Sequence, residues 1–90
     1  MHDEKVENDI EKLKLIMNVA TQCKLLGQVD DGIIERLALS VGELKHLAKT
    51  RNAKEKLQRI QNLLMQQKDI DGAIREMRKL ILSFYRGSSW

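Results

Sequence analysis

The chain has 90 residues, of which 42% are hydrophobic and 32% charged, with no proline and one cysteine. This length predicts one small domain over residues 1–90, and the composition excludes a disordered chain. No apolar run is long enough for a membrane span, and the acidic start excludes an ordinary signal peptide. One cysteine cannot form an internal disulfide, so we expect an intracellular, cytoplasmic protein.

The charge is unevenly divided along the chain. Residues 1–35 hold eight acidic side chains and four lysines, a net of −4, whereas residues 36–90 hold twelve lysines and arginines and five acids, a net of +7. The basic half could attract an acidic partner or a nucleic acid. Alternatively, the two halves are complementary and pack against each other.

The first helix is expected over residues 4–26. Its apolar residues recur at spacings of three and four, which predicts one buried face: Val6, Ile10, Leu13, Met17 and Ala20. A second set widens this face, as a bundle helix requires: Ile16, Val19, Cys23 and Leu26. Gly27 suits a left-handed end to this helix.

The second helix is expected to begin after Asp30 or Asp31, either of which can cap its first turn. If Asp30 is the cap, Val29 and Ile34 occupy the positions of a hydrophobic staple. The apolar face then continues through the helix: Ile34, Leu37, Val41, Leu44 and Ala48. Positive charges near the end of this helix complement its dipole.

Asn52 and Glu55 have the spacing of a capping-box variant, which predicts that a third helix starts there. Its apolar stripe follows: Leu57, Ile60 and Leu64. The periodicity fails over residues 66–72, and Asp69 can cap a fourth helix that ends near Tyr85. In the alternative, the last two helices are one continuous helix.

Short connections favour antiparallel neighbours. The sequence therefore predicts an all-α, antiparallel up-down bundle of four helices, or of three if the last two are continuous. The core must be aliphatic, because the chain has only three aromatic residues: Phe84, Tyr85 and Trp90.

No residue pattern indicates catalysis. Cys23 lies on an apolar face, which is typical of a buried structural thiol, and it shares no ligand spacing with His2 or His46. The acidic pairs, at residues 30–31 and 69–71, fall where helices start, so capping explains them. We expect no enzyme activity, metal, cofactor or small-molecule substrate.

Two surfaces are candidates for binding. Four apolar residues lie off the main faces and, if exposed, would mark a contact with a protein partner or a second copy of the chain: Leu15, Leu25, Leu39 and Met65. Two aromatic residues near the end of the chain, Tyr85 and Trp90, could be anchors or simply a frayed end. Basic residues of the second half could contact RNA or an acidic partner: Lys49, Arg51, Lys54, Lys56, Arg59, Arg75, Arg78 and Lys79.

Residues 27–44, together with Thr50, Arg51 and Asn52 and the apolar stripe that follows, are similar to a known helical domain. The domain is the C-terminal one shared by the steroid receptor RNA activator protein and the COPII outer-coat protein. Residues 57–65 also resemble a bacterial ribosome-associated helical family. These resemblances imply a helical interaction domain, which faces protein in the first case and RNA in the second. We expect an adaptor, regulator or scaffold that binds protein, with RNA or ribosome binding as the alternative.

Overall fold

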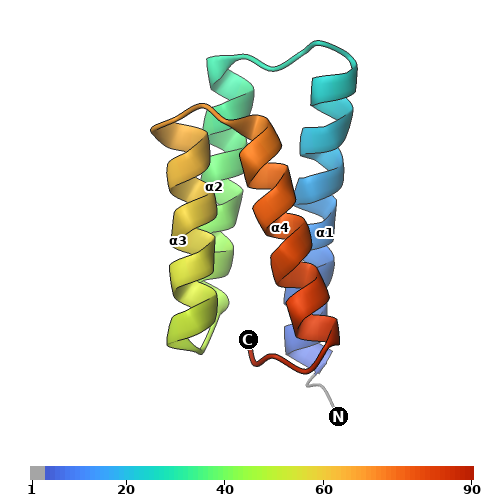
Figure 1. The fold of residues 1–90 in the computed structure, drawn as a ribbon, viewed down its shortest axis with the longest axis vertical. Coiled ribbons are helices and arrows are strands. Elements are labelled where there is room, and N and C mark those ends of the chain that lie inside the picture. Colours follow the sequence, from blue (N-terminus) through green and yellow to red (C-terminus); the bar gives the residue numbers. More distant parts are fainter. Residues whose placement is uncertain (1–3) are drawn as a thin grey trace.

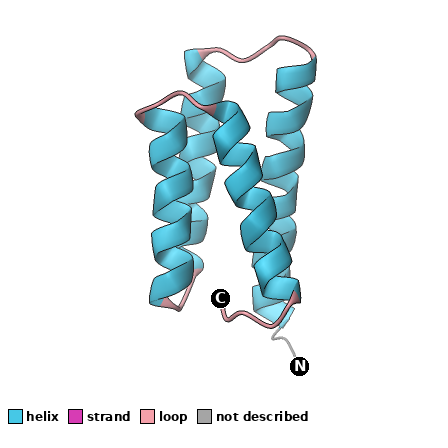
Figure 2. Cartoon of the chain, in the orientation of Figure 1, coloured by secondary structure: helices cyan, strands magenta, loops and turns pink. Residues whose placement is uncertain are grey.

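In the computed structural model, which describes residues 4–90, the chain folds into four α-helices and contains no strand over that range. The helices are α1 (Glu4–Leu25), α2 (Asp31–Leu47), α3 (Arg51–Met65) and α4 (Ile70–Tyr85). Each helix runs antiparallel to the next, and α1 packs against both α2 and α4 (Figure 1). The connecting segments lie at the two ends of the bundle (Figure 2). None of the described helices combines the length and apolar character needed to cross a membrane.

The division between α3 and α4 confirms the four-helix prediction. Lys68 adopts a left-handed backbone with φ of 50°, which stops the helical path after α3. The side chain of Asp69 then accepts a hydrogen bond from the backbone N–H of Gly72 at 2.8 Å and caps α4. Local capping chemistry therefore separates two helices whose apolar faces could otherwise be continuous.

The other caps agree with the sequence in part. Gly27 is left-handed, with φ of 67°, and Asp30 caps α2 by accepting from the N–H of Ile33 at 2.8 Å. The predicted start of the third helix at Asn52 is wrong. Thr50 is the cap, because its hydroxyl accepts from the N–H of Ala53, and Asn52 already lies inside the first turn.

The core is aliphatic, as predicted. The largest side chains with no solvent exposure come from all four helices: Ile10, Leu13, Val41, Leu57, Ile60, Leu64 and Met77. Cys23 is a half-buried free thiol, so the prediction of a buried cysteine is only partly right. Its position near the end of α1 leaves one side of the residue open to solvent.

The last five residues, 86–90, form a C-terminal strap across the lower end of the bundle (Figure 1). Trp90 is 5% exposed, and its indole Nε1 donates to Oδ2 of Asp9, itself 2% exposed, at 3.2 Å. The main-chain oxygen of Trp90 accepts from the N–H groups of Lys49 and Thr50 at 2.8 and 2.9 Å, and from the Thr50 hydroxyl at 3.2 Å. The strap therefore links α1 to the connection between α2 and α3.

This arrangement corrects the prediction for Trp90. Trp90 is neither an exposed partner anchor nor part of a frayed end. Its side chain belongs to the buried core, and both its indole and its main-chain oxygen form hydrogen bonds. Sequence position near the end of a chain suggested exposure, but an indole has enough apolar area to hold a short segment in place.

Candidate functional site

The most apolar open surface is a groove between α1 and α2. Two adjoining cavities, of about 200 and 280 Å³, lie between these helices and share three lining residues, Leu15, Ile16 and Ser40. We call this surface the α1–α2 groove. Its remaining lining is mostly apolar, with charged residues among it: Val19, Ile33, Leu37, Leu44, Leu47, Lys12, Arg36 and Glu43.

The groove exposes side chains that a core would normally cover. Leu15 is 63% exposed and Val19 is 44% exposed, although both contribute to the walls of the cavities. Leu26, 68% exposed, follows Val19 by seven residues and continues this line beyond the end of α1. The result is a strip of exposed apolar residues beside a hollow.

Ser40 provides a local reason for the hollow. It lies on the face of α2 that carries Leu37 and Leu44, and it lines both cavities. A hydroxymethyl side chain in this position leaves space that a leucine would fill. The five-residue connection from Leu26 to Asp30 carries the chain across the top of the bundle from α1 to α2, so the helices are not drawn together by a tight turn (Figure 1).

The structure brings only part of the predicted apolar partner site together. Leu15 lines the groove, whereas Leu25 lines a separate cavity between α1 and α4 with Arg75 and Arg78. Leu39 and Met65 are 60% and 49% exposed and line neither the groove nor the cavity at Leu25.

Tyr85 is exposed and contacts a cation. The ammonium of Lys14 lies 4.7 Å from the centroid of the Tyr85 ring and also pairs with Glu11 at 3.0 Å. The Tyr85 hydroxyl and then the Glu11 carboxylate raise the pKa of Lys14 above its ordinary value of 10.5. Tyr85 therefore already has a partner within the bundle, and this contact lies at the α1–α4 side.

Several groove residues were not predicted as a binding site. Ile16 and Val19 were assigned to a wide core face of the first helix, and Ile33 and Leu47 are half-buried beside the core. The detectable signal was the spacing of Leu15 and Val19, which places two apolar residues on one face of α1, with Leu26 following just past the end of that helix. Periodicity alone does not show how far the next helix stands from that face.

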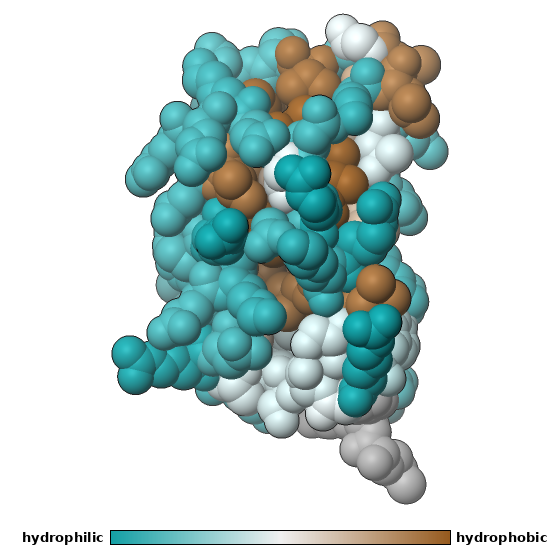
Figure 3. Space-filling model, viewed as in Figure 1, coloured by the Kyte–Doolittle hydropathy of each residue, from teal (hydrophilic) through white to brown (hydrophobic). Residues whose placement is uncertain are grey.

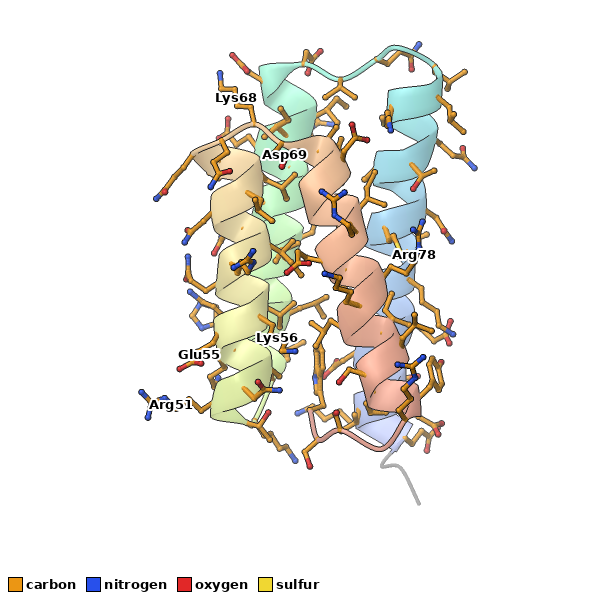
Figure 4. The ribbon with its side chains drawn as sticks, in the orientation of Figure 1. Arg51, Glu55, Lys56, Lys68, Asp69 and Arg78 are labelled. Carbon is orange, nitrogen blue, oxygen red and sulfur yellow. The ribbon has the colours of Figure 1, made fainter. Side chains whose placement is uncertain are left out.

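The predicted basic patch divides into two groups. Lys49 lies in the connection before α3, and Arg51 and Lys54 lie in its first turn. Arg51 pairs with Glu55 at 3.0 Å, and Lys54 donates to the main-chain oxygen of Lys45 at 3.1 Å. A cavity of about 350 Å³ lies there, lined by Lys45, His46, Arg51, Lys54, Glu55 and Gln58. In Figure 4, Arg51 points away from α4.

The other five cations form what we call the α3–α4 basic face: Lys56, Arg59, Arg75, Arg78 and Lys79. Lys56 lies between α3 and α4 in Figure 4, and Arg78 lies on the side of α4 nearer α1. This view of the surface is mainly hydrophilic (Figure 3). The basic face and the α1–α2 groove are therefore built from different pairs of helices.

The acidic pairs predicted as helix caps lie at helix starts in the structure. Asp30 and Asp69 act as helix caps, and within residues 4–90 no three His, Cys, Asp or Glu side chains are close enough to hold a metal ion. The surfaces that remain are the apolar α1–α2 groove and the α3–α4 basic face.

Comparisons of the chain with protein-family models, curated proteins and solved structures found no match. The two family resemblances noted in the sequence therefore stay predictions, and function has to be argued from the surfaces of the bundle itself.

Proposed function

We propose that this protein is a non-catalytic interaction module that binds an amphipathic helix of another protein in the α1–α2 groove. The observation that carries the proposal is the exposure of Leu15 and Val19 beside two adjoining apolar cavities. Exposed apolar surface next to a hollow is typical of a site that a partner covers.

A helix fits the shape of this groove better than a compact ligand. The groove follows the axes of α1 and α2, and the distance along α2 between two of its lining residues, Ile33 and Leu47, is about 21 Å at 1.5 Å per residue. A partner helix of about four turns would cover that length and place apolar side chains at intervals of three and four residues. Such a helix would complete the packing that α1 and α2 leave open.

The exposed side chains are suitable anchors in energetic terms. Full burial of a leucine or valine is worth about 1.5–3 kcal/mol. Because Leu15 and Val19 are already partly covered, each would contribute about 1–2 kcal/mol on docking. Lys12, Glu43 and Arg36 supply both signs of charge at the groove, so a partner with complementary charges would bind in one preferred direction.

Site-specific photocrosslinking tests the proposal. A benzoylphenylalanine at Val19 lies in the groove, and one at Leu39 is a matched control on an exposed apolar position outside it. In cells of the source organism, we expect a discrete adduct with another protein from Val19, none from Leu39, and loss of the adduct with Leu15→Asp.

Three outcomes contradict the proposal. The first is the absence of an adduct from Val19 in the folded protein, and the second is an adduct that forms equally from Leu39. The third is an adduct whose mass equals two copies of this chain, which would identify the groove as a contact between identical subunits.

A further inference from the structure

The cations of the α3–α4 basic face are placed in two short rows. Lys56 and Arg59 are three residues apart on α3, and the other three occupy successive positions on one side of α4: Arg75, Arg78 and Lys79. Residues three and four apart on a helix share a face, so each row points in one direction. Helices that pack together are about 8–10 Å apart, which sets the spacing between the rows.

Glu76 organises part of this face. Its carboxylate pairs with Arg59 at 3.0 Å from one oxygen and with Lys79 at 3.3 Å from the other, and its side chain is 21% exposed. It therefore holds two of the cations at a cavity of about 250 Å³ between α3 and α4, which Lys56 and the buried Leu80 also line. Five cations against this one carboxylate leave a net charge of +4.

Three of the five cations are available to a ligand. Lys56, Arg75 and Arg78 form no ion pair with any acidic side chain of residues 4–90, and all three are exposed. Asp71, on the same helix as the two arginines, pairs instead with Lys24. An arginine side chain without an internal partner can donate two parallel hydrogen bonds to one phosphate.

From this arrangement we infer that the α3–α4 basic face binds the phosphodiester backbone of a nucleic-acid duplex. The cavity of this face offers no apolar anchor for an acidic protein segment, because its one apolar lining residue, Leu80, is 4% exposed; the exposed Leu82 and Tyr85 lie further along α4. No aromatic side chain lines this cavity, so an unpaired base has no ring to stack on there. Cations in rows are suited to the repeating charge of a backbone, which is read without sequence specificity.

The test measures binding of the full chain to a fluorescent RNA hairpin with a stem of about 16 base pairs, and to a DNA duplex of the same sequence. Each phosphate contact contributes roughly −0.9 to the slope of log affinity against log salt. Contacts from the three unpaired cations predict a slope of about −2.7, which corresponds to roughly fortyfold weaker binding over a fourfold rise in salt.

Two triple variants that lose the same charge distinguish the effect of this face on binding from the effect of net charge. We expect K56Q/R75Q/R78Q to bring the slope close to zero, because it removes all three available cations. K5Q/K45Q/K68Q removes the same charge from other parts of the surface and should keep the original slope. Equal binding of the RNA and DNA supports backbone recognition, and tighter binding of either one identifies that nucleic acid as the source of the phosphates.

The inference is overturned if neither duplex binds at low salt, or if both triple variants weaken binding equally. It is also overturned if an acidic helical peptide, and neither duplex, binds and shifts the backbone NMR signals of Arg75 and Arg78. Because the groove residues are unchanged in K56Q/R75Q/R78Q, the photocrosslink from Val19 should survive in that variant. The two proposals can therefore fail separately.

Discussion

Substitution of Trp90 by alanine should be among the most destabilising single changes in this bundle. Trp90 is 5% exposed, and truncation of a buried aromatic residue to alanine typically costs about 3–5 kcal/mol. The change also removes the Nε1 donor from the buried Asp9 carboxylate, a loss worth about 1–3 kcal/mol. Because the strap lies at the end of the bundle, water can enter the space, and we expect a net loss of about 3–4 kcal/mol.

The assay is thermal and urea unfolding followed by far-UV circular dichroism, since Trp90 is the only tryptophan of the sequence and its removal abolishes the intrinsic fluorescence probe. A loss of this size corresponds to a fall in Tm of roughly 12–30 °C for a domain of this length. W90F should lose less, because it keeps most of the ring volume and gives up the Nε1 donor. Y85A, at a residue 53% exposed, is the control and should cost under about 1 kcal/mol. If W90A unfolds within about 1 kcal/mol of the parent chain, the argument that the strap is a structural part of the core is refuted.

Three further predictions concern single residues. Ser40→Leu should fill the α1–α2 groove, change the free energy of unfolding by less than about 1.5 kcal/mol, and abolish the photocrosslink from the groove; an unaltered crosslink would show that the partner binds elsewhere. Thr50→Ala should cost about 1–2 kcal/mol in urea unfolding because it removes the cap of α3, whereas Asn52→Ala should be nearly neutral, and the reverse order would restore Asn52 as the cap. The pKa of Lys14 is raised, so the stabilising contribution of its charge should be complete below pH 10.5 and lost as the pH rises through the folded-state pKa. NMR titration of the Lys14 side chain should detect this, and Tyr85→Phe, which removes the first cause, should bring the pKa back toward 10.5; an unchanged value would refute that cause.

The helices of this bundle were predictable because local chemistry sets them. Asp30 and Asp69 cap helices, and Gly27 adopts a left-handed turn, as their residue types favour. The periodicity of the aliphatic residues marks the buried faces. The start of α3 was not predictable in the same way. Thr50 and Asn52 are both good capping residues, and the choice depends on a contact distant in sequence, since the Thr50 hydroxyl also donates to the main chain of Trp90.

The α1–α2 groove was missed for a related reason. The apolar residues Ile16 and Val19 have the spacing of a core face, and only the separation of the two helices leaves Val19 open. That separation depends on the size of Ser40 and on the connection at the top of the bundle, neither of which affects periodicity. The basic residues were recognised from the sequence, but ion pairing to Glu55 and Glu76 decides which charges remain available.

The hollow between α1 and α2 also bears on how the native molecule opens. A helix that packs incompletely on one side has less apolar contact to lose when it detaches, so α1 is the element most suited to partial, reversible unfolding. The strap opposes this opening, because Trp90 joins Asp9 of α1 to the start of α3. Amide hydrogens of α1 should then exchange with solvent together and ahead of those in α2 and α3, and a bound partner helix would slow that exchange by holding α1 against the remaining three helices.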